Sequence, residues 1–245
     1  MGDSQYKVLA PLVSVLLAAG LSGCDGGDVR ASHLPEACED GDAAACDALG
    51  AKYLTGDSVP EDASRAATLF QQACDGGYAA GCYKLGMMYR EAVGLPQDDT
   101  RAASLLREAC DSGYAQGCNY LGGMYFEGVG VPQDHARAVS LIQRACSGGD
   151  AQGCANLGIM YLTGQGVPQD LTHAVSLFQR ACDGGDAKGC RNLGVFYRDG
   201  IGVSRDLARA ASLFEQACDA GDVEGCYALG IWYVDGDEVP VDYGR

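Results

Sequence analysis

Thirteen cysteines give this chain its largest potential for side-chain chemistry. All except Cys24 fall into two series, and each series advances by 36 residues per step. The first series is Cys38, Cys74, Cys110, Cys146, Cys182 and Cys218, and the second is Cys46, Cys82, Cys118, Cys154, Cys190 and Cys226. Two residues eight apart in one helix lie roughly 12 Å from each other, whereas a disulfide needs Cα atoms within about 7 Å. The chain must therefore fold back between the two cysteines of a pair.

We expect each pair to form a disulfide across a tight corner between two helices. Cys74 would close one helix and Cys82 would lie in the first turn of the next, with Gly76 and Gly77 suited to a left-handed helix cap. The six expected bridges are Cys38–Cys46, Cys74–Cys82, Cys110–Cys118, Cys146–Cys154, Cys182–Cys190 and Cys218–Cys226. A metal or redox series is the alternative, but seven intervening residues match neither zinc-knuckle nor Cys-x-x-Cys spacing.

The other residues that could carry chemistry do not gather into a recognisable site. After residue 23 the chain has no Ser-x-x-Lys, Ser-Asp-Asn or Lys-Thr-Gly, the motifs of serine β-lactamases. His33, His135 and His173 do not have metal-ligand spacing, and His173 holds a position that is arginine in sister repeats. The loops of the Gly128-Val129-Gly130 type follow no strand, which argues against phosphate binding. The sequence therefore predicts no cofactor and no metal, and catalytic residues stay unknown.

Two helical segments are expected in each repeat. The first, for example residues 115–126, carries Leu-Gly-x-x-Tyr, whose leucine and tyrosine share one helix face. A glycine inside a helix costs up to about 1 kcal/mol relative to alanine, so its recurrence suggests close approach of a neighbouring helix. The motif occurs at Leu49/Gly50/Tyr53, Leu85/Gly86/Tyr89, Leu121/Gly122/Tyr125, Leu157/Gly158/Tyr161, Leu193/Gly194/Tyr197 and Leu229/Gly230/Tyr233.

The second segment carries Ala-x-x-Leu-Phe-x-x-Ala-Cys, the spacing of an amphipathic helix. An aspartate precedes it in a Val-Pro-x-Asp sequence and is a suitable N-cap. These aspartates are Asp62, Asp98, Asp134 and Asp170, with Asp206 in a variant that lacks the proline.

The period, the two helix motifs and the paired cysteines together resemble the Sel-one-like repeat, a relative of the tetratricopeptide repeat, in its cysteine-rich exported bacterial form. The resemblance covers Cys38 to the C-terminus. It implies an all-α fold, a right-handed α/α solenoid of 36-residue helix-turn-helix repeats, with the first helix of each pair lining the concave side. The array would span residues 33–245, as five full repeats with partial repeats at both ends. Some proteins of this type are described as penicillin-binding proteins or β-lactamases.

The first 23 residues are expected to be a lipoprotein signal peptide. An apolar run from Val8 to Leu21 is too short for a comfortable membrane span, and Leu21-Ser22-Gly23-Cys24 resembles a bacterial lipobox. Cys24 would then carry the lipid, and residues 24–32 would form a polar tether. An ordinary secretory signal with a chance cysteine is the alternative. Both imply export, which suits disulfides, since these persist in oxidising compartments.

The chain carries a net charge of −16, and this restricts its partners. Removal of residues 1–23 takes away Lys7 and Asp3, so the mature chain keeps the same net charge. A strongly negative body repels both nucleic acid and anionic lipid headgroups. We therefore expect no nucleic-acid partner, and membrane attachment through the lipid anchor only.

Positions that vary between repeats point to a binding face. Residues five and two before the shared leucine, and two and five after it, follow one face of the first helix. Mixed aromatic, amide and arginine side chains on that face are typical of a peptide-binding groove. The candidate binding residues are Tyr83, Arg90, Asn119, Phe126, Arg191, Arg198 and Tyr227. The alternative is that exposed positions vary without function.

The sequence therefore predicts an exported, lipid-anchored repeat scaffold that binds a protein or peptide partner in the cell envelope. A β-lactamase or penicillin-binding hydrolase is the alternative, and it rests on the family resemblance alone.

Overall fold

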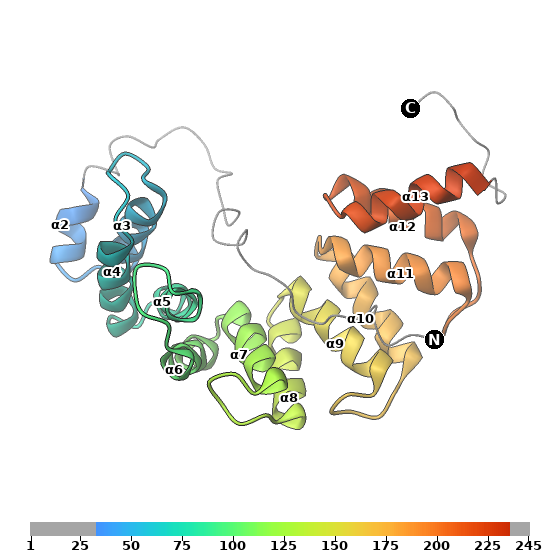
Figure 1. Ribbon diagram of the computed structural model, residues 1–245, viewed down its shortest axis with the longest axis horizontal. Helices are drawn as coiled ribbons and strands as arrows, with labels where there is room; N and C mark the ends of the chain where they lie inside the picture. Colours follow the sequence, from blue (N-terminus) through green and yellow to red (C-terminus); the bar gives the residue numbers. More distant parts are fainter. Residues whose placement is uncertain (1–32, 236–245) are drawn as a thin grey trace. The chain divides into compact units, whose positions relative to one another are not determined.

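The computed structural model describes the backbone of residues 33–235 and the side chains of residues 33–231 (Figure 1). These residues form twelve helices and no strand, which confirms the all-α fold class. The helices are α2 (Leu34–Glu39), α3 (Ala43–Thr55), α4 (Ala63–Asp75), α5 (Ala79–Glu91), α6 (Asp99–Asp111), α7 (Ala115–Glu127), α8 (His135–Ser147), α9 (Ala151–Thr163), α10 (Leu171–Asp183), α11 (Ala187–Asp199), α12 (Leu207–Asp219) and α13 (Val223–Asp235). The signal peptide, the lipidation of Cys24 and the tether lie outside the described residues, as do residues 236–245.

The helices group into two compact units, which we describe separately. The first contains α2 to α7 and the second contains α8 to α13. In each unit consecutive helices pack against one another, and the core is built from the recurring apolar positions of both helix types. Phe70, Leu85 and Leu106 are buried in the first unit, and Phe178 and Phe214 in the second. Among residues 33–235, none of the helices combines the length and the apolar character needed to cross a lipid bilayer.

All six predicted disulfides are present, and they close the corners between helices. Their Cα atoms lie 4.4 to 4.7 Å apart, so the chain does fold back within each pair. At the second corner α4 ends at Asp75 and α5 begins at Ala79, with Cys82 in its first turn. Only the second glycine of the turn is left-handed, since φ is −76° at Gly76 and 81° at Gly77. The first glycine is therefore not required by the backbone, and serine or alanine replaces it at other corners.

The predicted N-caps are confirmed. The side chain of each capping aspartate accepts a hydrogen bond from the backbone N–H three residues later, at 2.9 Å, as Asp62 does from Arg65. The same bond begins α6, α8, α10 and α12. Because the first N–H groups of a helix have no partner within it, these bonds fix the start of every full-length second helix.

The glycine of Leu-Gly-x-x-Tyr lies where the two helices of a repeat cross. A Cβ added to Gly158 would lie 2.8 Å from the Phe178 ring, and one added to Gly50 would lie 2.9 Å from the Phe70 ring. Both distances are shorter than real Cβ contacts allow. The predicted close approach is therefore confirmed at these crossings.

An aromatic contact joins the two helices of a repeat near the first turn of the second helix. The Arg65 guanidinium lies 4.6 Å from the centre of the Tyr53 ring, and Arg209 lies 4.5 Å from the Tyr197 ring. His173 takes the same place, with its ring centre 4.4 Å from that of Tyr161. The structure therefore agrees with the prediction that His173 is a variant of a structural position.

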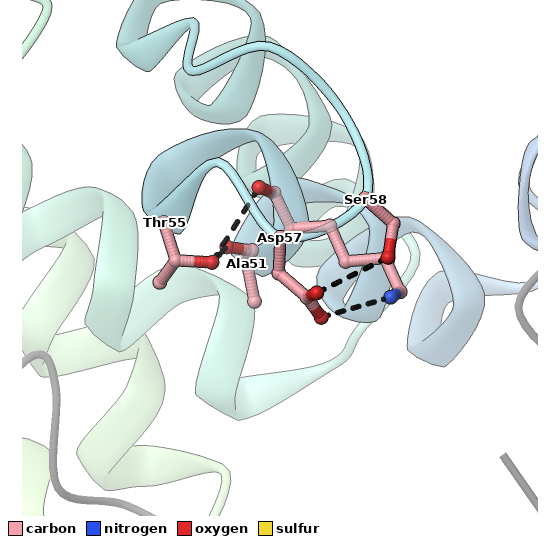
Figure 2. Close-up of polar contacts among 5 residues, drawn as sticks. Ala51, Thr55, Asp57 and Ser58 are labelled. Carbon is pink, nitrogen blue, oxygen red and sulfur yellow. Dashed lines mark hydrogen bonds and ion pairs between the residues drawn. The ribbon is translucent and has the colours of Figure 1, made fainter.

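Two residues of the first unit hold left-handed conformations that other repeats give to glycine. Ala92 ends α5 with φ of 57°, at the position of Gly56, Gly128 and Gly164. Ser58 has φ of 66°, and its hydroxyl donates a hydrogen bond to Asp57 Oδ1 at 3.1 Å; Figure 2 shows this contact as a dashed line. Lys52 donates to the other carboxylate oxygen at 3.1 Å, and this hydrogen bond, followed by the one from Ser58, lowers the pKa of Asp57.

Replacing Ala92 by glycine is expected to raise the free energy of unfolding by about 0.5 to 1 kcal/mol. An L-residue in the left-handed region costs about 1 to 2 kcal/mol, and the greater backbone entropy of glycine offsets part of the gain. Urea denaturation measures the change. Ala80→Gly, in the right-handed first turn of α5, is the control and should destabilise by up to about 1 kcal/mol. Equal destabilisation by both changes would contradict this account.

Candidate protein-binding surface

The first helices of adjacent repeats contact one another through residues that vary between copies. We call the residue two before the shared leucine the ladder position, because Asp47, Tyr83 and Arg191 at this position each contact the following first helix. In the first unit Lys84 of α5 donates to Asp47 Oδ2 of α3 at 2.7 Å. Asp47 is only 7% exposed, so this pair is largely screened from water. A variable position has thus become a matched contact between two repeats.

Tyr83 continues this pattern with aromatic contacts. Its ring centre lies 5.1 Å from that of Tyr114 and 5.5 Å from that of Tyr120, within the range of favourable aromatic pairs. Only 8% of Tyr83 is exposed, and only 5% of Asn119 at the next ladder position. The prediction that these two side chains lie on an open surface is therefore wrong. For Tyr83 it is wrong because Tyr120 of the following first helix packs against its ring.

The second unit pairs charges at the ladder position. Arg191 of α11 lies with Nε 3.6 Å from Asp222 Oδ1, and its guanidinium also contacts Glu224 of α13. Asp186 sits at the start of α11, where burial raises its pKa although it accepts a hydrogen bond from the Gly189 N–H. Tyr227, at the last ladder position, is 70% exposed.

The residues five after the shared leucine remain accessible, and we call them the outer row. They are Leu54, Arg90, Phe126, Leu162 and Arg198, and all of them are half-buried. Arg90 donates to Glu127 Oε2 at 3.4 Å, which joins α5 to α7. Arg198 binds both carboxylate oxygens of Asp199, at 2.6 and 2.8 Å. These bonds raise the pKa of Arg198 and lower that of Asp199, so both groups stay charged.

The cysteines lie beside residues supplied by the following repeat. Gln72 Oε1 is 3.4 Å from Cys38 Sγ, and a carboxylate oxygen of Glu108 lies within 4.8 Å of both Cys74 Sγ and Cys82 Sγ. In the second unit Arg180 donates to the Cys146 carbonyl at 3.1 Å. Cys74 and Cys82 are bonded to each other, so neither sulfur is a thiolate ligand. We therefore interpret Glu108 as a covering residue of the corner.

Sequence reasoning missed the partners of the ladder residues. Lys84 and Tyr120 directly precede the shared leucine, a position that the helix pattern does not mark as part of the variable face. A signal was nevertheless present, since Asp47 and Lys84 are 37 residues apart with opposite charges, and so are Arg90 and Glu127. Both contacts therefore join residues that are separated by one 36-residue repeat plus one further residue.

Removing one member of the Asp47–Lys84 pair is expected to cost more than removing both. Lys84→Met leaves a buried carboxylate without its cation, for a loss of about 2 kcal/mol. This is less than the cost for a fully buried pair, because the Lys84 side chain keeps 26% of its exposure. Asp47→Asn combined with Lys84→Met should recover about 1 kcal/mol. Urea denaturation of the four proteins measures the coupling, and strictly additive losses would show that the pair is not coupled.

This arrangement is suited to binding a protein or peptide. In each unit ladder contacts join neighbouring first helices, as Asp47 and Lys84 do, and the outer row presents half-buried aromatic, aliphatic and arginine side chains beside them. Aromatic residues and arginines are enriched among the residues that dominate the energy of protein interfaces. In each unit the candidate surface is therefore the outer row, supported by the ladder beneath it.

Comparison with known proteins agrees with this architecture. The Sel1 repeat model matches residues 43–78, 79–114, 115–150, 151–186, 187–222 and 223–245. A protective antigen of uropathogenic Escherichia coli strains with the same repeat fold is 32% identical, with a TM-score of 0.79; the match covers 88% of this chain and 46% of that one. A Sel1 repeat protein from Oxalobacter formigenes is 24% identical, with a TM-score of 0.78, over 86% of this chain and 84% of that one.

An immunity protein from Pseudomonas aeruginosa shares the fold at 21% identity, with a TM-score of 0.56, over 79% of this chain and 74% of that one. No match was found among curated proteins. This chain spans about half the length of the Escherichia coli antigen. The six matched repeats extend from residue 43 to residue 245, and the chain therefore belongs to the Sel1 repeat family.

Proposed function

We propose that this protein is an exported scaffold that binds a protein or peptide partner in the cell envelope and is held to a membrane by lipid on Cys24. The binding function rests on one observation. The packing residues are nearly identical in every repeat, while the accessible outer row changes from arginine to phenylalanine to leucine at a fixed spacing. Ladder residues such as Asp47 and Tyr83 also vary, but they are buried and their contacts with the next repeat account for it, whereas the outer row varies while it still reaches solvent.

The roles of the candidate residues follow from their exposure. Arg90, Phe126, Arg198 and Tyr227 contact the partner, because their side chains reach solvent. Tyr83, Asn119 and Arg191 act beneath them and position the first helices. Six disulfides support an oxidising, exported location.

Replacing three outer-row residues separates binding from folding. The variant Arg90→Ser, Phe126→Ser, Arg198→Ser is used as bait in pull-downs from envelope extract, beside a control with Ser104→Ala and Ser140→Ala on exposed second-helix positions. Truncating an aromatic or arginine anchor can cost about 2 kcal/mol of binding, so capture should fall by well over tenfold. The melting temperature of both variants should change little. Full capture by the folded outer-row variant would refute the assignment.

The anchor has its own test. Cys24→Ser should release the protein from the membrane fraction if Cys24 carries lipid. Retention of this variant at high salt would contradict the lipid anchor. The β-lactam hydrolase alternative has no support from the geometry, and nitrocefin turnover by the purified protein tests it directly.

A further inference from the structure

Several corner disulfides lie beside a side chain from the second helix of the following repeat. This side chain comes two residues after the large apolar residue of that helix, and we call its place the covering position. At the first corner it is Gln72, whose Oε1 atom lies 3.4 Å from Cys38 Sγ. In the second unit Gln216 holds the same position, with Oε1 3.7 Å from Cys182 Sγ. At these two corners the covering group is therefore an uncharged amide.

A negative charge takes the covering position at the bridge between Cys74 and Cys82. The residue there is Glu108, and one of its carboxylate oxygens lies within 4.8 Å of both sulfur atoms. In the part of the chain that the structure describes, no other bridge has a carboxylate so close to both of its sulfurs. The first unit thus places one negative charge directly beside one disulfide.

A positive charge takes the covering position at the bridge between Cys146 and Cys154. Arg180 donates to the Cys146 carbonyl oxygen at 3.1 Å, and Cys154 Sγ lies 3.6 Å from the same oxygen. Asp150 precedes α9 at this corner, but its carboxylate forms no cluster with the two sulfurs of the kind that Glu108 forms. The covering position therefore brings a guanidinium group to this bridge.

The two charged corners are otherwise closely alike. Cys74 and Cys82 are 2% and 1% exposed, and Cys146 and Cys154 are 1% and 3% exposed. The Cα atoms of each pair are 4.5 Å apart, with one cysteine in the last turn of a second helix and the other in the first turn of a first helix. Both bridges need the same kind of local opening before a thiol can reach them. The sign of the covering charge is the difference that remains beside the sulfurs.

Thiol–disulfide exchange is sensitive to this sign. A thiolate of an external dithiol forms a bond to one cysteine sulfur while the S–S bond breaks, and the electron pair stays on the other cysteine as a thiolate. The second thiol of the reagent then displaces the first cysteine, so the reagent becomes a disulfide and its two protons pass to the two protein thiolates. A carboxylate repels both the incoming and the departing thiolate, whereas a guanidinium attracts both. Glu108 should therefore slow exchange at its corner, and Arg180 should favour it.

We propose that the bridge between Cys146 and Cys154 is a site of thiol–disulfide exchange with dithiols, while Glu108 keeps the bridge between Cys74 and Cys82 closed under the same conditions. Exchange at this site opens the corner between α8 and α9 and leaves the corner between α4 and α5 intact. This inference goes beyond the proposed binding function and does not depend on it.

Partial reduction of the oxidised full chain tests the proposal. The chain is treated with dithiothreitol at neutral pH and low salt, samples are quenched with acid, new thiols are alkylated, and each bridge is followed by peptide mass spectrometry. The bridge between Cys146 and Cys154 should be reduced at least about fivefold faster than the bridge between Cys74 and Cys82. Sodium chloride at about 1 M should narrow this difference, because both covering side chains are exposed and their charges are screened.

Glutamine is the matched replacement at both covering positions, because Gln72 and Gln216 are its natural counterparts in sister repeats. Glu108→Gln should speed reduction of its own bridge by about threefold, and Arg180→Gln should slow reduction of its own bridge by a similar factor. Each variant should leave the other bridge at its original rate. Hydrogen exchange in the helices that flank each corner should match that of the unchanged chain, which separates an effect of charge from a change in local opening.

Two bridges reduced at equal rates in the unchanged chain, or in the reverse order, would overturn the proposal. So would glutamine variants that both keep the original rates. A change of rate that follows an equal change in hydrogen exchange would assign the difference to local opening instead of charge, and it would overturn the proposal as well.

Discussion

Replacing Cys146 and Cys154 together by alanine is expected to lower the free energy of unfolding by about 2.5 kcal/mol, and reduction of all six bridges is expected to unfold the protein at ordinary temperatures. A bridge that closes a loop of about nine residues removes that much chain entropy from the unfolded state. Both cysteines are buried, at 1% and 3% exposure, so alanine avoids placing a hydroxyl group in the core. Thermal and urea melts of the oxidised double variant measure the loss.

Hydrogen exchange can identify the helices in which the double variant loses stability. Repeat arrays couple chiefly to their nearest neighbours, so protection should fall most in α8 and α9 and least in α12 and α13. The matched control replaces Cys218 and Cys226, which close a loop of the same length but are only half-buried. Removal of this bridge should raise the chain entropy of the unfolded state by the same amount, but it should disturb the packing of the folded protein less. Identical melts with and without a reductant would contradict the role given to the bridges.

Adding one methyl group at Gly194 is expected to destabilise the protein, while the same change at Gly230 is expected to leave it unchanged or more stable. At Gly194 the new Cβ would lie 2.8 Å from the Phe214 ring, so α11 and α12 must separate. Overpacking of this kind costs about 1 to 3 kcal/mol, less the gain of up to about 1 kcal/mol that alanine brings to a helix. At Gly230 only the helix gain applies, because nothing lies within 4 Å.

The two glycines occupy the same place in the same repeat motif, so each is the control for the other. Urea denaturation should separate the two variants by about 2 kcal/mol. Equal destabilisation by Gly194→Ala and Gly230→Ala would contradict the difference in packing at these two positions.

Local chemistry made much of the fold predictable from sequence. Asp62 and its equivalents cap helices because an aspartate side chain can reach the N–H three residues on, and this depends on the chain around it alone. The disulfides were predictable because Cys74 and Cys82 would lie too far apart to bond if they shared one continuous helix. The turn residues between them allow the chain to fold back and bring the two cysteines together. Gly158 predicted a helix crossing because a glycine inside a helix lowers stability, and its recurrence indicates that a neighbouring helix packs too closely for a Cβ atom.

The surface was less predictable, because burial depends on the distance between repeats. The pattern of one helix groups Tyr83 and Arg90 on the same face, and the sequence therefore assigned both to one open groove. In the structure Tyr120 of the next first helix packs against Tyr83, whereas Arg90 keeps contact with solvent. The offset between neighbouring first helices decides which residues are covered, and this offset is a tertiary property that the period of one helix does not contain.

The ladder also limits how an array of this kind can evolve after tandem duplication. Identical packing residues would let a module be deleted, copied or moved without a new interface. The matched junctions oppose this, because deletion of residues 79–114 would place Tyr120 opposite Asp47 in the position of Lys84. A buried carboxylate would then face a phenol instead of an ammonium group. Deletion of this module should therefore destabilise the array by about 2 kcal/mol, as loss of the Lys84 ammonium group does, so the matched pairs favour one order of the modules over others.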